Sequence, residues 1–122
     1  MKIRIKGNSI RIRLTKTEVD TFGKKGMLED RTEFGDGEFV YALCSIHSGD
    51  GLTATIKGNR ITMWVPEKMK EEWTSTGLVG MQNKISTGPD KSLFLLLEKD
   101  FVCIDNTFED QSDNYPNPNA VC

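Results

Sequence analysis

Two short segments near the start of the chain carry five cationic side chains at alternate positions. Residues 2–6 read Lys-Ile-Arg-Ile-Lys and residues 10–14 read Ile-Arg-Ile-Arg-Leu, with Gly7-Asn8-Ser9 between them. Alternation with period two predicts two β-strands, each with one apolar and one charged face. Gly7-Asn8 predicts a two-residue hairpin turn, because both residue types tolerate positive φ. In the register that this turn sets, one face holds all five cations: Lys2, Arg4, Lys6, Arg11 and Arg13.

This cationic face predicts a site for anions. The register places Arg4 opposite Arg11 and Lys2 opposite Arg13, and like charges directly opposite each other in a ladder are destabilising. Phosphate and carboxylate groups match the fork of an arginine side chain, so a phosphate-bearing small molecule or an acidic protein partner would offset the repulsion. The alternatives are a face that is simply solvated, or one that acidic residues of the same chain neutralise.

The cysteines and the single histidine supply a second candidate chemistry. Cys44 and His47 are three residues apart, and together with Cys103 and Cys122 they make a set of ligands that a tetrahedral zinc ion could take. The paired short loops of a zinc knuckle are absent, however, and Cys44 ends an apolar run in which a small core residue is expected. We therefore expect no metal here. Pairing of Cys103 with Cys122, as a disulfide or as metal ligands, would attach the C-terminal segment to the last strand.

Carboxylates near the end of the chain offer a third possibility. Glu98, Asp100 and Asp105 could hold a divalent cation beside a phosphate, as in a metal-dependent phosphate-ester hydrolase, but exposed acids in a turn explain them equally. His47, with Asp50 nearby, is a weak candidate for a base. The chain contains no nucleophile elbow, P-loop, Glu-x-x-His metal motif or dinucleotide fingerprint. We therefore expect a binding or interaction protein rather than an enzyme, and no cofactor.

Capping and turn signals predict the elements that position these residues. After the first hairpin, Thr15 and Glu18 form the capping-box pair of a short helix that ends at a glycine, Gly23 or Gly26. A second hairpin turns at residues 58–59, and Pro66 opens a second helix. Branched and aromatic residues and apolar runs predict the remaining strands, at residues 27–34, 38–46, 92–98 and 101–104.

The chain also repeats itself. Residues 5–10 (IKGNSI) return as residues 56–61 (IKGNRI), and the offset of 51 holds for Ile12 with Met63, Leu14 with Val65 and Phe22 with Trp73. We expect a duplicated unit of hairpin, helix and further strands, with pseudo-repeats at about 1–50 and 52–105. The predicted fold is a single α+β domain over residues 1–105, with two short helices and a mostly antiparallel, barrel-like sheet of about nine strands, since closure removes exposed edges.

The two ends of the chain carry opposite charge although the formal net charge is only −2. Residues 1–25 hold eight Lys and Arg against two acids, and residues 98–122 hold six acids against one lysine. Residues 106–122 have no apolar periodicity and contain Tyr115-Pro116-Asn117-Pro118, which predicts an extended acidic arm. Docked over the first hairpin, Asp110 and Asp113 would supply its counter-charges. The protein would then be a structural or protein-interaction module without a ligand.

Composition argues against several classes of protein. The 122 residues, 28% charged and 37% hydrophobic, describe one ordinary globular domain. The longest apolar run, residues 93–97, is far shorter than the roughly 20 residues of a membrane helix. The N-terminus has no signal-peptide core, and three cysteines do not suit a secreted disulfide framework, so we expect a cytoplasmic protein. The pI of about 5.4, and cations without interleaved aromatics, argue against nucleic acid as a partner.

Segments at both ends of the chain resemble a small family of bacterial proteins of unknown function. The resemblance lies in residues 1–14 (MKIRIKGNSIRIRL), 98–103 (EKDFVC), 113–118 (DNYPNP) and Cys122. It implies a single bacterial domain with no assigned activity and no assigned site residues. The duplicated layout and basic strands are also similar in architecture to the triphosphate tunnel enzymes, whose closed barrel binds triphosphate with inward Lys and Arg and a divalent metal. Those enzymes carry Glu-x-Glu-x-Lys where this chain has Lys2-x-Arg4-x-Lys6, so the analogy extends to architecture only.

Overall fold

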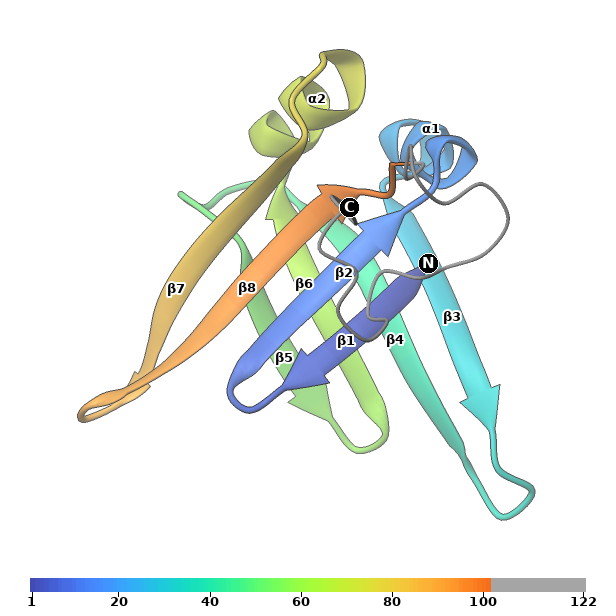
Figure 1. The fold of residues 1–122 in the computed structure, drawn as a ribbon, viewed down its shortest axis with the longest axis vertical. Helices are drawn as coiled ribbons and strands as arrows, with labels where there is room; N and C mark the ends of the chain where they lie inside the picture. The colour runs from blue at the N-terminus through green and yellow to red at the C-terminus, as the bar shows by residue number, and fades with distance from the viewer. Residues whose placement is uncertain (102–122) are drawn as a thin grey trace, which may run out of the picture.

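The structure of the chain, a computed structural model, describes residues 1–101 and confirms the α+β class (Figure 1). In this part of the chain lie two helices and eight strands, in the order β1 (Lys2–Lys6), β2 (Ser9–Leu14), α1 (Lys16–Lys25), β3 (Met27–Glu33), β4 (Glu38–Ile46), β5 (Thr53–Lys57), β6 (Arg60–Pro66), α2 (Glu67–Ser75), β7 (Gly80–Gly88) and β8 (Lys91–Lys99). Neither helix of the described residues is long and apolar enough to span a membrane.

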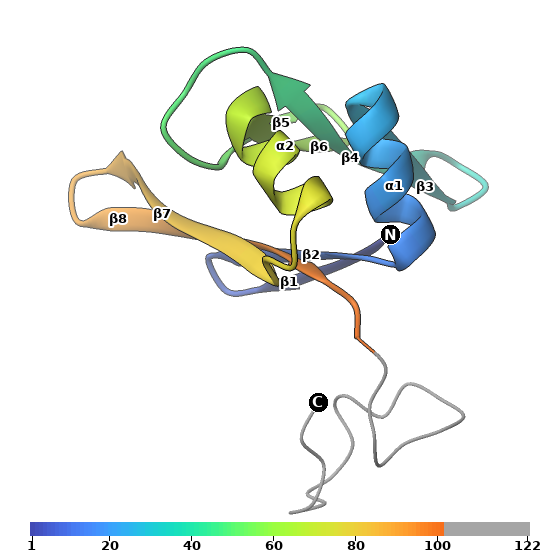
Figure 2. The same ribbon diagram turned by 90° about the horizontal axis from the view of Figure 1, so that it is seen from above.

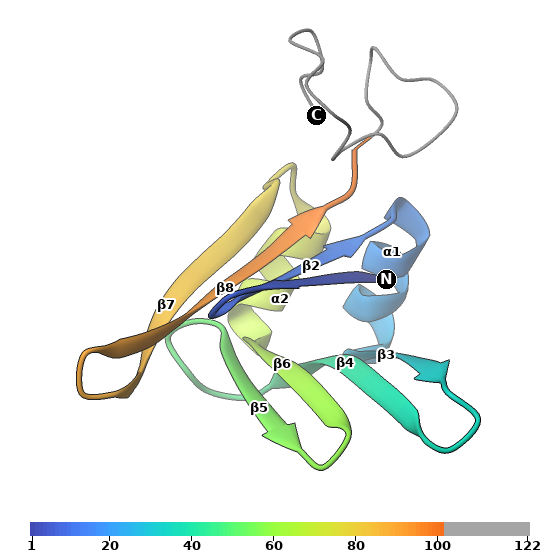
Figure 3. The ribbon, with the colours of Figure 1, turned by 60° about the horizontal axis from the view of Figure 1, so that its bottom comes forward.

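The strands form two sheets of four, in the orders β1-β2-β8-β7 and β3-β4-β6-β5. Pairing is antiparallel except in the middle of each sheet, where β2 runs parallel to β8 and β4 parallel to β6. The predicted barrel-like closure is wrong, because β1 and β7 end one sheet and β3 and β5 end the other (Figure 3). Two layers packed face to face bury the apolar faces without closure, and the charged side chains of β1 oppose pairing at its edge.

The core lies between the two sheets, with both helices covering one end of the space (Figures 1 and 2). Figure 2 shows α1 and α2 next to each other between the sheets. Each helix contributes one fully buried aromatic side chain, Phe22 from α1 and Trp73 from α2. The other large, fully buried side chains come from the strands and from one loop: Ile12, Leu14, Leu43, Leu52, Met63, Val65, Leu95 and Leu97.

The first hairpin and the helix after it form as the sequence predicts. All five predicted cross-strand pairs occur, from Lys2 with Arg13 to Lys6 with Ser9, and Gly7 takes the expected positive φ of 55°. The capping box is confirmed: the Thr15 hydroxyl accepts a hydrogen bond from the Glu18 backbone N–H at 3.3 Å, and the Glu18 carboxylate accepts one from the Thr15 N–H at 2.9 Å. Ile10 and Ile12 of the hairpin are buried in the core and Ile3 packs against it, whereas Ile5, near the turn, is 53% exposed. The cations lie on the other face of the hairpin.

The second half of the chain differs from the prediction in its last strands. β7 was not predicted, because its residues are mostly polar and only one of its faces meets the core. It pairs antiparallel with β8 and so occupies the place expected for a returning strand over residues 101–104. Phe101 lies outside any strand, and residues 102–104 lie outside the described residues. The described part of the chain thus holds eight strands where about nine were expected.

The order of elements in residues 2–46 recurs in residues 53–99, as two strands, a helix and two strands. β1 begins at Lys2 and β5 at Thr53, in agreement with the offset of 51, and Gly7 and Gly58 take nearly the same φ, 55° and 56°. Each sheet contains one hairpin from each half. Replacing every strand by its counterpart in the other half converts the order β1-β2-β8-β7 into β5-β6-β4-β3, which is the order of the second sheet. The duplication itself stays a prediction.

Candidate functional site

Three rows of side chains cross the outer face of the β1-β2-β8-β7 sheet. The row nearest the first hairpin turn holds Lys6, Ser9, Phe94 and Lys84. The middle row holds Arg4, Arg11, Leu96 and Gln82, and the row nearest the helices holds Lys2, Arg13, Glu98 and Gly80. Because neighbouring strands lie about 4.8 Å apart, side chains next to each other in a row are within reach of contact. Cations therefore occupy the β1–β2 half, and β8 places apolar and acidic groups beside them.

We call Lys2, Arg4, Lys6, Arg11 and Arg13 the basic face. Acids neutralise it mainly at the end near the helices. Glu98 Oε1 lies 2.6 Å from Arg13 Nε and 3.7 Å from Arg11 Nε. Asp100 Oδ2 lies 2.9 Å from Lys2 Nζ. The position of β8 beside β2 brings these two acids to the basic face. They provide part of the charge compensation that was expected from Asp110 and Asp113, which lie outside the described residues.

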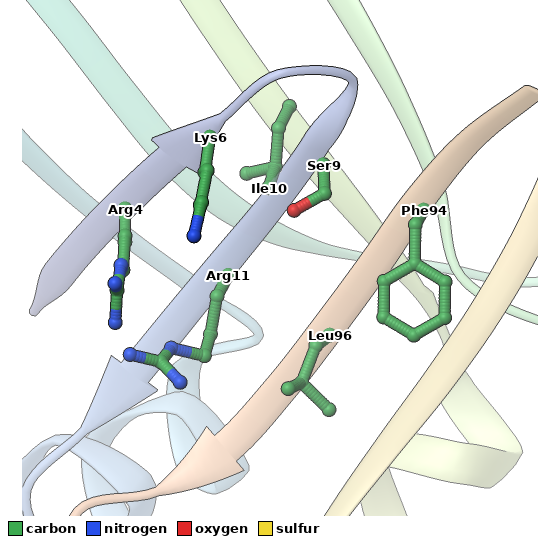
Figure 4. A pocket seen from close by; sticks show the side chains of 7 residues that line it. All are labelled: Arg4, Lys6, Ser9, Ile10, Arg11, Phe94 and Leu96. Carbon is green, nitrogen blue, oxygen red and sulfur yellow. The ribbon is translucent and has the colours of Figure 1, made fainter.

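Toward the hairpin turn, the basic face has no acidic partner within residues 1–101. Neither Arg4 nor Lys6 makes an ion pair or hydrogen bond there, and both are exposed. They line a pocket of about 180 Å³ together with Arg11, Phe94 and neighbouring groups (Figure 4). One water molecule takes about 30 Å³ in the liquid. The pocket therefore has room for a phosphate group and part of the molecule that carries it.

The charge of this pocket is positive. The polar side chains that line it are Arg4, Lys6, Ser9 and Arg11. No histidine or carboxylate lies beside the Ser9 hydroxyl among the described residues that line the pocket. The arrangement can hold an anion through charge-assisted hydrogen bonds.

The matching face of the second hairpin carries fewer cations. Threonines and a tryptophan occupy the positions that match Lys2, Arg4, Arg11 and Arg13, namely Thr53, Thr55, Thr62 and Trp64. Trp64 Nε1 donates a hydrogen bond to Thr55 Oγ1 at 3.0 Å. The exposed Lys57 is the counterpart of Lys6, since each ends its strand before a Gly-Asn turn. This face of the second hairpin thus carries two cations, Lys57 and Arg60, where the first hairpin carries five.

A cluster of paired charges on β3 and β6 includes Arg60 of this second hairpin. The Glu29 carboxylate pairs with Arg60 and, at 2.5 Å, with Arg31. Hydrogen bonds from Arg60 and Arg31 lower the pKa of Glu29. The hydrogen bond between Arg31 and Glu29 raises the pKa of Arg31, and the charges of Glu38 and Glu29 raise it further. The arginines of this sheet are therefore already satisfied by acids of the fold.

Of the four predicted zinc ligands, the described residues include two, Cys44 and His47. Cys44 lies on β4 opposite Trp64 of β6, and burial raises the pKa of its thiol while the charge of Arg60 opposes the shift. His47 follows β4 with a side chain that is 98% exposed, and its Nδ1 lies 3.0 Å from Glu67 Oε2. Cys103 and Cys122 lie outside the described residues. Among the side chains of residues 1–101, no group of three or more His, Cys, Asp or Glu is suited to a metal ion.

Of the predicted divalent-cation ligands, the described residues include Glu98 and Asp100. Glu98 faces Arg13 and Asp100 faces Lys2, so both carboxylates are engaged by cationic side chains. Asp105 lies outside the described residues.

Sequence reasoning missed the apolar neighbours of the basic face. Phe94 and Leu96 belong to a run in which every residue from 93 to 97 is apolar, and such a run does not show which residues face the core. In the structure Leu95 and Leu97 are fully buried, whereas Phe94 is 38% exposed. Only the parallel pairing of β2 with β8, whose residues are more than 80 positions apart, brings Phe94 beside Ser9.

Comparison with known proteins gives a family but no function. Residues 1–119 match the family described as "Family of unknown function (DUF7009)", which confirms the resemblance to a small family of uncharacterised proteins. No curated protein and no solved structure matches the chain.

Proposed function

We propose that this chain, which belongs to the DUF7009 family of unknown function, binds an anionic, phosphate-bearing ligand on the basic face of its first hairpin. The observation that carries the proposal is the pocket in which Arg4 and Lys6 stand without an acidic partner from residues 1–101. An anion placed there would meet at least two charges that the described part of the fold leaves uncompensated.

Electrostatics of the ladder support this proposal. Arg4 lies directly opposite Arg11, and cross-strand like charges destabilise a sheet. A phosphate between these side chains replaces repulsion by charge-assisted hydrogen bonds, and the Ser9 hydroxyl at the same pocket is a further donor. Because the basic face is open to water on one side, we expect binding to weaken as salt is added.

A thermal-shift experiment at low ionic strength tests the proposal with phosphate, pyrophosphate and triphosphate. A ligand at ten times its Kd stabilises the folded protein by about 1.4 kcal/mol, roughly 4–7 °C for a chain of this size. We expect a shift that saturates with concentration and is much reduced in Arg4→Ala and Arg11→Ala. Sodium chloride of matched ionic strength controls for screening, and a linear, non-saturating rise would indicate general salt exclusion. Absence of a saturable shift with all three anions would overturn the proposal.

A second candidate function is an interaction module in which the chain neutralises its own basic face. The pairs of Lys2 with Asp100 and of Arg13 with Glu98 favour it, since acids at the end of β8 already compensate part of this face. If residues 106–122 compensate the rest, their deletion should lower the melting temperature, and more so at low salt. Unchanged stability in the deletion variant would rule out that role for the acidic segment and leave the anion site as the better explanation.

We also infer that the two halves of the domain arose by duplication and that the protein is cytoplasmic. The repeated order of elements and the shared geometry at Gly7 and Gly58 support the first inference. An experimental structure in which residues 2–25 do not superpose on residues 53–76 would contradict it. The free thiol of Cys44 suits a reducing compartment. Fractionation of the cells that make the protein tests the location.

A further inference from the structure

We propose that the ligand of the basic face is an aryl or heteroaryl phosphate, a small molecule in which an aromatic ring adjoins the phosphate, and that Phe94 receives the ring. This inference rests on the proposed anion site and adds the chemical class of its ligand. Its starting point is that the pocket is lined on one side by cations and on the other by two apolar side chains, Phe94 and Leu96 (Figure 4).

The layout of the sheet sets where the two parts of such a ligand would lie. Lys6 and Arg4 belong to β1, Arg11 and Ser9 to β2, and Phe94 to the next strand, β8. Adjacent strands are about 4.8 Å apart, so a phosphate held over β1 and β2 has Phe94 only one strand spacing away. A ring joined to that phosphate through a single ester oxygen can span this distance. The anion and the ring would then occupy one continuous pocket.

Phe94 is well suited to receive an aromatic ring. It is 38% exposed, although its neighbours Leu95 and Leu97 on the same strand are fully buried. Aromatic rings pair in offset-stacked or edge-to-face arrangements, which bury apolar surface on both partners. Lys84 of β7 stands beside Phe94 on the side away from β2, and a cation near an aromatic face is attracted to it. Phe94 thus lies in a row with a lysine at each end.

Inorganic phosphate would use only part of this pocket. It would leave Phe94 and Leu96 in contact with water, and the pocket of about 180 Å³ is larger than one phosphate needs. An aliphatic phosphate ester could cover some of the same surface, but it would lack a ring face to pair with Phe94. We therefore expect the contribution of Phe94 to the binding affinity to increase from inorganic phosphate to an aliphatic phosphate ester and again to an aryl phosphate.

A nuclear magnetic resonance titration with phenyl phosphate and methyl phosphate tests the inference. At pH 8 both are dianions, since the second pKa of a phosphate monoester is about 6, so they differ only in the ring. We expect the wild type to bind phenyl phosphate about five- to tenfold more tightly, which is the gain for a modest area of apolar surface removed from water. In Phe94→Ala the ratio should fall to about two or less, with the affinity for methyl phosphate unchanged.

Phe34→Ala is the matched control, because Phe34 is also exposed, at 66%, but follows β3 of the other sheet. It should leave the phenyl-to-methyl ratio as in the wild type. If Phe94→Ala does not fold, Phe94→Leu replaces it, because leucine keeps an apolar side chain without the ring. The phenyl-to-methyl affinity ratio of Phe94→Leu is then compared with that of the wild type. Equal affinity of the wild type for both esters would overturn the role of Phe94 while leaving the anion site intact. Failure of both esters to bind would instead overturn the proposed function itself.

Discussion

Replacing Glu98 with glutamine removes the carboxylate that compensates two arginines of the basic face. Its Oε1 lies 2.6 Å from Arg13 Nε and 3.7 Å from Arg11 Nε, and the Glu98 side chain is only 20% exposed. Glutamine keeps nearly the same shape and an oxygen acceptor but loses the negative charge. The substitution therefore isolates the electrostatic part of these contacts. We expect it to destabilise the fold and to strengthen anion binding.

The expected loss follows from the two contacts. A hydrogen bond to a charged group contributes about 1.5–3 kcal/mol, of which the glutamine amide retains a part. The attraction between Glu98 and Arg11 adds about 1 kcal/mol in surroundings close to water. We therefore expect Glu98→Gln to lower the free energy of unfolding by about 1.5–3 kcal/mol at low salt.

Urea unfolding at low and high salt provides the assay. The Debye length is about 30 Å at 0.01 M salt and about 3 Å at 1 M, so the loss should shrink to about 1 kcal/mol or less at high salt. Pyrophosphate should stabilise Glu98→Gln more than the wild type, because the variant's basic face has lost a competing anion. Asp20→Asn is the control, since it breaks a fully surface pair with Lys24 and should cost about 0.5 kcal/mol or less.

Two results would refute this reasoning. An equal loss at both salt concentrations would show that Glu98 acts through packing rather than charge. Unchanged or increased stability at low salt would show that the carboxylate does not offset repulsion among the arginines.

Three further predictions concern other parts of the molecule. In Gly80→Ala the added Cβ would lie 2.7 Å from the Leu97 carbonyl oxygen, so stability should fall by about 1–3 kcal/mol, whereas Gly77→Ala, with open space around it, should change the urea midpoint little. The pKa of Glu29 is lowered in the folded protein, so its contribution to stability is present above the pKa of a glutamate in the unfolded chain, about 4.3, and is lost as the pH falls through the lower folded pKa. In a plot of the urea midpoint against pH, Glu29→Gln should therefore reduce the fall in the midpoint at acidic pH. An unchanged fall would contradict this prediction. Because burial raises the pKa of the Cys44 thiol, iodoacetamide at pH 8 should label this thiol more slowly in the folded protein than in urea. Peptide-resolved mass spectrometry measures the two rates, and equal rates would contradict the raised pKa.

Local elements of this fold could be predicted because several signals agree at the same residues. In the first hairpin, the alternation of residues 2–6 and 9–14 and the Gly7-Asn8 turn require one register, and the structure has it. For α1, the Thr15–Glu18 capping box marks the start, and Gly26, with a φ of 72°, marks the end. Each of these features depends on residues close together in the chain.

The arrangement of the strands could not be predicted in the same way. The two parallel pairs join residues from different halves of the chain, such as Ile12 with Leu97, and no local pattern indicates such partners. Polar β7 was missed because it is an edge strand with one face in water. The barrel was expected from the need to remove edges, but the structure buries its apolar faces by packing two sheets together and leaves edges at β1, β7, β3 and β5.

The candidate site shows the same division. The register of a single hairpin places five cations on one face. Which of them are compensated depends on where β8 lies, because β8 and the residue after it bring Glu98 and Asp100 to Arg13 and Lys2. The aromatic neighbour Phe94 also depends on that placement. The sequence therefore predicts the charge of the site but not its shape.

The dissociation constant of pyrophosphate, measured by calorimetry at low ionic strength for Lys6→Ala and Lys57→Ala, tests the central claim most directly. The two lysines end matching strands before matching Gly-Asn turns, both are exposed, and only Lys6 lines the pocket. If the basic face is the anion site, Lys6→Ala should weaken binding by about threefold or more, while Lys57→Ala leaves it unchanged. Equal effects of the two substitutions would contradict a site on the first hairpin.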